Sequence, residues 1–230
     1  MQSSKRPKYI IIEGIDGAGK QTQAAILKDY LISRGKKVIV QSFPDYPSQG
    51  CGPIKMYLNG ELSKTAEEVD AYQSSVLFAV DRFCTMKKML NSIDNETIVI
   101  FDRYVSSNLL HQGGKIKDEK ELEKYIKWEE DFEFNVMKIP KPDIIFFLKV
   151  SPEVSVENRK NRSDNKSGTV KDIHESDNEH LIHAYNTGIK IAKMLNWHII
   201  NCANDETKKM LDKEVIAKEI ETKLNEVLGI

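Results

Sequence analysis

The sequence EGIDGAGKQT, residues 13–22, follows the apolar run Tyr9-Ile10-Ile11-Ile12 and precedes an amphipathic segment. This order predicts a strand, a glycine-rich turn and a helix, and Gly14, Gly19 and Lys20 have the G-x-x-x-x-G-K spacing of a phosphate-binding loop. Glycines let the backbone curl until its N–H groups point at phosphate oxygens, while Lys20 and the amino end of the helix add positive charge. An ordinary glycine turn is the alternative, and the matching strand and helix on either side argue against it.

One residue of this loop departs from the motif. A serine or threonine after the lysine would offer its hydroxyl to Mg²⁺, but this chain has Gln21 there and places a hydroxyl one residue later, at Thr22. Phosphate binding by the backbone is unaffected by this exchange. Which side chain contacts the metal is left open.

Length and composition favour a soluble α/β protein. With 230 residues the chain can bury a large core, and we expect residues 1–230 to form a single domain. The net charge of −1 gives no overall basic field, so we expect no binding to nucleic acid or to a membrane surface. No apolar run reaches the ~18 residues of a membrane span. The odd, sparse set of cysteines (Cys51, Cys84 and Cys202) suits a reducing compartment, and we expect a cytoplasmic location.

Five apolar runs alternate with helical patterns along the chain. The runs lie at residues 9–13, 37–43, 97–101, 143–150 and 197–201. Helices are expected at residues 20–34, 53–58, 67–90, 118–138, 179–195 and 208–228, with one more beginning at Ser151. This alternation predicts the α/β class, with a five-stranded, mostly parallel sheet covered by helices on both faces. Together with the phosphate loop, it predicts the P-loop NTPase fold.

Two of the expected helices have apolar stripes that we assign to the core. The stripe of residues 67–90 consists of Tyr72, Val76, Val80, Phe83, Met86 and Leu90, and that of residues 118–138 consists of Leu122, Tyr125, Trp128, Phe132 and Val136. The many charges of the second helix are interpreted as a solvated face. Phe78 and Arg82 lie off the first stripe and share one helix face, where they could grip a planar ring and its polar edge. A core phenylalanine beside a surface arginine is the alternative.

Polar residues follow two of the expected strands. Asp102 ends the run at residues 97–101, which in a chain with a phosphate loop is the Walker-B arrangement for Mg²⁺, and Arg103 beside it can clamp phosphates. A salt-bridged pair at a strand end is the alternative. The loop that starts at Phe43-Pro44 leaves the carboxyl end of another parallel strand, where ligands bind in such sheets.

The helix that begins near Ser151 carries Arg159, Lys160 and Arg162, and a strongly polar stretch follows it. A basic helix and a polar flap suit a mobile lid that closes over a triphosphate, with a plain surface loop as the alternative. The five histidines form no metal-like cluster, and we expect His180 and His183 to lie at the surface.

With these features in place, the chain resembles the thymidylate kinase family. The resemblance covers nearly the whole length and rests on five motifs in order: the phosphate loop with Asp16, Phe43-Pro44, Phe78-Ala79-Val80-Asp81-Arg82, Asp102-Arg103-Tyr104, and a lid at about residues 159–175. It implies transfer of the γ-phosphoryl group of ATP to thymidine 5′-monophosphate (dTMP), with Mg²⁺ as cofactor. It also implies a homodimer packed through long helices, for which the helix containing Phe78 is one candidate.

The resemblance implies the following site. ATP would bind at Gly14, Gly17, Ala18, Gly19, Lys20, Gln21 and Thr22, and dTMP at Asp16, Phe43, Tyr46, Phe78, Arg82, Arg103, Asn108 and His111. The catalytic groups would be Lys20, Arg103, Asp16, Arg159 and Arg162, and Asp102 and Asp16 would organise the metal, directly or through water.

Some positions depart from the family. Gly17 stands where some members carry an arginine, which directs attention to Arg159 and Arg162 of the lid. His111 replaces a tyrosine thought to crowd a ribose 2′-hydroxyl, and Asp45 replaces a basic residue found in some members. A kinase for another pyrimidine nucleotide or deoxynucleoside, and a non-catalytic nucleotide-binding paralogue, remain the alternatives.

Overall fold

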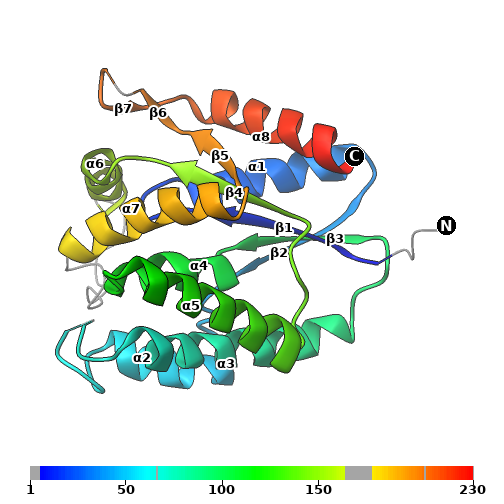
Figure 1. The fold of residues 1–230 in the computed structure, drawn as a ribbon. Coiled ribbons are helices and arrows are strands. Elements are labelled where there is room, and N and C mark those ends of the chain that lie inside the picture. Colours follow the sequence, from blue (N-terminus) through cyan, green and yellow to red (C-terminus); the bar gives the residue numbers. More distant parts are fainter. Residues whose placement is uncertain (1–5, 66, 164–177, 205, 230) are drawn as a thin grey trace.

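The computed structural model describes residues 6–65, 67–163, 178–204 and 206–229. Its centre is a five-stranded parallel sheet with the strand order β2-β3-β1-β4-β5 (Figure 1). The strands are β1 (Lys8–Glu13), β2 (Lys37–Ser42), β3 (Thr97–Asp102), β4 (Ile144–Lys149) and β5 (His198–Asn201). This arrangement confirms the α/β class and the sheet expected from the alternating apolar runs.

Helices of varied length connect and surround these strands. The α-helices are α1 (Lys20–Ser33), α2 (Gly52–Leu58), α3 (Ala71–Leu90), α4 (Val105–His111), α5 (Glu119–Glu130), α6 (Pro152–Ser163), α7 (Asn178–Met194) and α8 (Lys213–Leu228). Shorter turns are η1 (Gln49–Cys51), η2 (Gly113–Lys115) and the π-helical η3 (Asp131–Val136), and a small antiparallel pair is formed by β6 (Ala203–Asn204) and β7 (Lys209–Met210).

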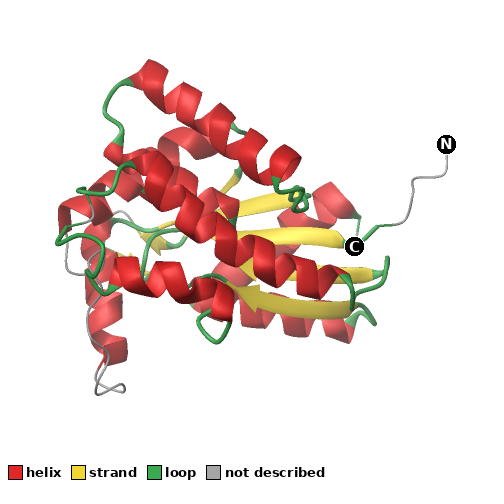
Figure 2. Ribbon diagram, turned by 90° about the horizontal axis from the view of Figure 1, so that it is seen from below, coloured by secondary structure: helices red, strands yellow, loops and turns green. Residues whose placement is uncertain are grey.

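The central strands β1, β3 and β4 are buried on both faces, whereas the edge strand β2 is largely exposed. On one face, Ile10 and Ile12 of β1 belong to a core that includes apolar side chains of α1 and α8. On the other face, Tyr9 and Ile11 pack in a core with Met86 of α3. Figure 2 shows helices of this second face lying over the strands. Alternate residues of a strand point to opposite faces, so a strand covered on both sides has the continuous apolar run seen in the sequence.

The strand register brings three loops together. Ile12 of β1 pairs with Asp102 of β3, and Ser42 of β2 pairs with the same Asp102. The carboxyl ends of β1, β2 and β3 therefore lie side by side, and the segments that follow them form one continuous region at that edge.

The start of α3 differs from the expectation. The helix begins at Ala71 rather than near Glu67, because Asp70 caps it. The Asp70 carboxylate accepts the Gln73 N–H at 2.8 Å, and Gln73 Oε1 accepts the Asp70 N–H at 3.3 Å, which is a capping box.

The apolar stripe assigned to α3 is also wrong. Tyr72, Val76 and Leu90 are exposed, and Met86 is the only residue of that stripe that is buried. The buried face carries polar side chains instead, among them Ser74, Ser75, Asp81, Arg82 and Thr85. The periodicity was misleading because this face of α3 lines a polar site rather than the apolar core.

The helix expected at residues 118–138 is interrupted. After α5 the chain forms the π-helical turn η3, whose wider spacing changes which side chains face inward. Glu129 and Glu133 are fully buried, while Val136 is 63% exposed. The interpretation of the charges as a solvated face is therefore wrong for these two glutamates.

Three smaller differences concern other elements. The last helix begins at Lys213 rather than Lys208, since residues 203–210 contain the β6–β7 pair. The short helix α4 was not expected. His180 is 4% exposed and packs inside the molecule, so its assignment to the surface is wrong.

Candidate active site

The segment after β1 forms the loop that the motif predicts. Gly14, Gly17 and Gly19 have positive φ angles of 151°, 82° and 92°, which glycine adopts without steric cost. Lys20 begins α1, and its Nζ donates to the backbone oxygen of Ile15 at 3.0 Å. Burial lowers the pKa of Lys20, and the nearby Arg103 lowers it further.

The helix α6 holds this loop from one side. Ser155 Oγ donates to the backbone oxygen of Asp16, and Asn158 Nδ2 donates to that of Gly17 at 2.7 Å. A Cβ atom at Gly17 would lie 2.5 Å from the backbone oxygen of Ser155 and 3.0 Å from Cγ of Arg159. Arg159 thus occupies the space that a side chain at position 17 would need, which agrees with basic groups reaching the loop from α6.

Asp16 and Arg103 form an ion pair at the meeting point of β1 and β3. Arg103 Nη2 donates to Asp16 Oδ1, and its Nη1 lies 3.9 Å from Glu13 Oε1. Burial alone would raise the pKa of Asp16, but Arg103 and Lys20 outweigh it and hold that pKa well below its usual range. Asp16 is therefore ionised at neutral pH. Arg103 has φ of 68°, a strained conformation of the kind that concentrates at functional sites.

Glu13 is a site residue that the sequence reasoning missed. It is fully buried, and its Oε2 accepts hydrogen bonds from Ser106 Oγ at 2.7 Å and Ser107 Oγ at 2.8 Å. Its Oε1 accepts the Gly14 N–H at 2.9 Å. The sequence feature that could have identified Glu13 is its position as an acidic residue at the end of a wholly apolar strand. Glu13 links the loop after β1 to α4 and adds negative charge beside Arg103.

Two histidines extend the contacts of Arg103. Arg103 Nη1 lies 2.9 Å from His111 Nε2, and His111 Nδ1 lies 3.3 Å from Nε2 of the stacked His180. A guanidinium only donates, so His111 accepts through Nε2 and carries its hydrogen on Nδ1. His111 therefore contacts the arginine as well as the cavity expected to bind dTMP.

A cavity of about 240 Å³ opens beside the ion pair. All eight residues that the resemblance assigns to dTMP line it, together with Pro44, Leu58, Asp81, Ser107 and Gln112. Phe78 is partly buried and meets Tyr57 edge to face with ring centroids 6.3 Å apart, which fixes its ring. Phe78 and Arg82 thus share the cavity, as expected from their common helix face.

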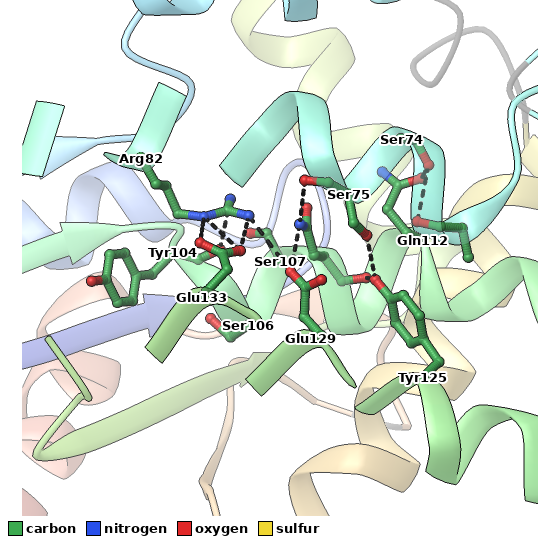
Figure 3. A network of polar contacts seen from close by, with 12 residues as sticks. Ser74, Ser75, Arg82, Tyr104, Ser106, Ser107, Gln112, Tyr125, Glu129 and Glu133 are labelled. Carbon is green, nitrogen blue, oxygen red and sulfur yellow. Dashed lines mark hydrogen bonds and ion pairs between the residues drawn. The ribbon is translucent and has the colours of Figure 1, made fainter. Parts of the chain in front are cut away.

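Buried carboxylates hold the polar wall of this cavity (Figure 3). Arg82 is 2% exposed, and its Nε donates to Glu133 Oε2 at 2.8 Å and to Oε1 at 3.1 Å. Asn108 Nδ2 donates to the backbone oxygen of Ser75 at 3.2 Å and to Glu129 Oε1 at 2.6 Å. Sequence reasoning missed both glutamates, because no local pattern distinguished them from the other charges of that helix.

A second, polar hollow of about 170 Å³ surrounds the phosphate loop. Asp16, Gly17, Gly19, Lys20, Gln21, Phe43, Asp102 and Arg103 line it. It shares Asp16, Phe43 and Arg103 with the larger cavity. The two spaces therefore meet at the ion pair.

Asp102 has the chemistry expected of a metal-organising residue. Its Oδ1 is buried and has no hydrogen-bond partner among the described residues. An unpaired carboxylate oxygen that faces a phosphate-sized hollow fits a bound Mg²⁺ ion. Within the described residues no group of three or more potential ligands exists, so such an ion would complete its coordination with phosphates and water.

Several expected residues are only partly placed. Arg162 lies in α6, but its side chain and residues 164–175 of the expected lid are outside the part that the structure describes. Gln21 is exposed, and Thr22 lies in the first turn of α1. Asp45 does not face the cavity: its Oδ2 accepts a hydrogen bond from Thr85 at 2.8 Å.

A glycine-rich loop at the end of β1, an adjoining arginine and two connected cavities define a P-loop protein built to bind two phosphorylated ligands side by side. A model of the thymidylate kinase family matches residues 12–213 of the chain. The chain belongs to the thymidylate kinase family, as its motifs indicated. The kinase class expected from the sequence is thereby confirmed.

Individual relatives of the chain are thymidylate kinases as well. A thymidylate kinase of Mycobacterium tuberculosis is 33% identical over 171 residues, covering 74% of this chain and 78% of that protein. One of Prochlorococcus marinus is 31% identical over 205 residues, covering 86% and 89%. The solved thymidylate kinase of Candida albicans has a TM-score of 0.66 at 19% identity, covering 97% of this chain and 93% of that chain, and this likeness bears on the fold alone. None of the described helices is both long and apolar enough to cross a membrane.

Proposed function

We propose that this protein transfers the γ-phosphoryl group of ATP to dTMP, giving dTDP and ADP, as a step toward dTTP. The observation that carries the proposal is the meeting of the two cavities at Asp16 and Arg103. Phosphoryl transfer requires a donor and an acceptor held in line and the charge between them neutralised, with little covalent work by the protein.

The donor side is the hollow around the phosphate loop. Backbone N–H groups of residues 17–22 would cradle the ATP phosphates, with Lys20 close to the outer ones. Asp102 would hold Mg²⁺, with Asp16 near it, and the ion would neutralise phosphate charge. Arg103 would then contact donor and acceptor phosphates together, since it lines both spaces.

The acceptor side is the larger cavity. Phe78 would stack on the thymine ring, and Arg82 and Asn108 would meet its polar edge. Phe43, Tyr46 and His111 would complete the wall, with Asp16 near the sugar.

The region that would close the site is α6 and the segment after it. Arg159 lies against the phosphate loop, and its Nε is buried without a hydrogen-bond partner in the described part of the chain. We expect Arg159 and Arg162 to neutralise the charge that develops during phosphoryl transfer. Residues 159–175 would act as a lid that keeps water from hydrolysing ATP.

We also propose that residues 1–230 form a single domain and that the protein is located in the cytoplasm.

A coupled assay for ADP production with ATP and Mg²⁺ tests this function. The acceptors are dTMP, dUMP, dCMP, UMP, CMP, AMP and GMP, with an acceptor-free control for ATP hydrolysis. We expect dTMP to give the highest kcat/KM. Equal rates with dTMP and the purine nucleotides would refute the assignment, and a preference for another pyrimidine would redirect it to the alternative kinase.

A homodimer formed through α3 is part of the proposal. Tyr72, Val76 and Leu90 form an exposed apolar set on this helix, and Val136 at the end of η3 is exposed as well. Helical spacing places the three α3 side chains on one side of the helix, and apolar side chains exposed together favour association. Sedimentation equilibrium should give twice the chain mass of 26.3 kDa, whereas a mass of one chain at micromolar concentration would contradict it.

A further inference from the structure

Two buried glutamates lie behind the polar wall of the acceptor cavity and do not line it. Glu129 lies in the last turn of α5 and Glu133 in the π-helical turn that follows, and both are 0% exposed. Glu133 holds Nε and Nη2 of Arg82, while Glu129 Oε1 lies 2.6 Å from Asn108 Nδ2 and 3.7 Å from Arg82 Nη2. Burying two carboxyl groups beside one guanidinium is costly, so the arrangement calls for a function beyond packing.

The amide of Asn108 has its orientation fixed by these contacts. Its nitrogen carries two hydrogens, and it lies between two acceptors, the backbone oxygen of Ser75 at 3.2 Å and Glu129 Oε1 at 2.6 Å. Both hydrogens are therefore used inside the protein. For a ligand in the cavity, Asn108 therefore offers its side-chain carbonyl oxygen, which can accept a hydrogen bond.

We propose that Glu129 is a positioning residue that sets base specificity, by locking the Asn108 amide so that the cavity presents an acceptor beside the Arg82 donor. This inference rests on the proposed function and adds a residue to it. An imide edge, as in thymine or uracil, offers a carbonyl oxygen next to an N–H, which pairs with a donor and an acceptor. Cytosine offers an amino group next to an unprotonated ring nitrogen, so both contacts would be mismatched and left unpaired.

The buried position of Glu129 favours the neutral carboxyl group, which still accepts the Asn108 hydrogen bond at Oε1. Burial and the adjacent Glu133 raise its pKa well above the usual range, although Arg82 and Asn108 oppose this. Arg82 pairs directly with Glu133. Glutamine has the same shape and the same acceptor atom, and Glu133 would take a hydrogen bond from its amide nitrogen. Glu129→Gln is therefore expected to preserve the orientation of Asn108, and Glu129→Leu to release it.

The experiment compares kcat/KM for dTMP and dCMP in wild type, Glu129→Leu, Glu129→Gln and the exposed control Glu123→Leu on the same helix. Glu129→Leu should lower the dTMP:dCMP ratio at least about tenfold, the value of one hydrogen bond. Glu129→Gln should stay within about twofold of wild type, as should Glu123→Leu. The KM for ATP and the unfolding temperature are measured alongside, because a loss confined to general stability would not change the ratio.

The dTMP:dCMP ratios of these variants decide whether the inference holds. An unchanged ratio in Glu129→Leu, or a loss in Glu129→Gln as large as that in Glu129→Leu, would overturn the inference. If Glu129→Leu does not fold, the glutamine variant decides: retention of the wild-type ratio supports a neutral acceptor, and loss of it overturns the inference. Failure of the proposed function is distinguishable, because it would appear in the wild type as a lack of preference for dTMP.

Discussion

Replacing Gly17 with alanine tests whether α6 and the phosphate loop form one unit. The φ of 82° at this position costs a residue with a Cβ about 1–2 kcal/mol. The new Cβ would also lie 2.5 Å from Ser155 O and 3.0 Å from Arg159 Cγ, so α6 must move. Overpacking of this kind adds about 1–3 kcal/mol. We expect Gly17→Ala to lower the free energy of unfolding by about 2–5 kcal/mol and, by displacing Arg159, to lower kcat.

Two matched glycine controls separate these contributions. Gly35 has φ of 74° with no atom within 4 Å of an added Cβ, so Gly35→Ala should lose only the backbone contribution of about 1–2 kcal/mol. Gly19 has φ of 92° and its nearest neighbour, Met210 Cε, is 4.0 Å away, so Gly19→Ala places a methyl group in the same loop without touching α6. Urea unfolding gives the stabilities, and steady-state kinetics give kcat and the KM for ATP.

The loss of stability in Gly17→Ala, compared with that in Gly35→Ala, tests whether the contact with α6 matters. If Gly17→Ala is no more destabilising than Gly35→Ala, the close contact with Ser155 does not restrain the loop. If its kcat also equals that of wild type, Arg159 is not positioned by this contact, and the reasoning fails for both stability and function.

Three further changes probe other parts of the molecule. Arg103→Ala should reduce kcat about 100-fold or more, the usual cost of losing a charge-stabilising donor, with a much smaller change in stability; wild-type turnover would refute its phosphate role. Phe78→Ala should raise the KM for dTMP about tenfold with the KM for ATP unchanged, and unaltered dTMP affinity in calorimetry would count against stacking. Burial lowers the pKa of Lys115 from 10.5 to about 8, so the unfolded chain binds more protons between these pH values. The stability of wild type relative to Lys115→Met should accordingly rise by about 3 kcal/mol from pH 8 to 10.5, and parallel pH profiles would contradict this.

The sheet and the phosphate loop could be predicted because their signals are local. The strands at residues 9–13 and 97–101 are apolar throughout, and a strand buried on both faces has no other pattern. Gly14, Gly19 and Lys20 have a spacing that few other structures require. The pairing of Phe78 with Arg82 followed from helical spacing, which the common cavity bears out.

The parts that were missed depend on contacts between distant segments. Glu13, Glu129 and Glu133 look like ordinary charges in the sequence, and only packing against α3 and α4 shows that they are buried. The π-helical turn could not be detected by a search for apolar residues that recur every 3.6 residues. The stripe of Tyr72 and Val76 was placed inside because periodicity finds an apolar face without telling what covers it.

In the ion pair between Arg103 and Asp16, the carboxylate occupies the guanidinium that we propose to bind the substrate phosphates. Before any nucleotide arrives, the guanidinium already has a carboxylate in contact and a second, Glu13, at 3.9 Å. A free anion such as inorganic phosphate must displace a tethered partner of the same sign, and it lacks the base and sugar contacts that would compensate. A nucleotide has those contacts and can exchange with Asp16. Under the proposed function, this pairing would favour phosphates attached to a nucleoside over simple anions.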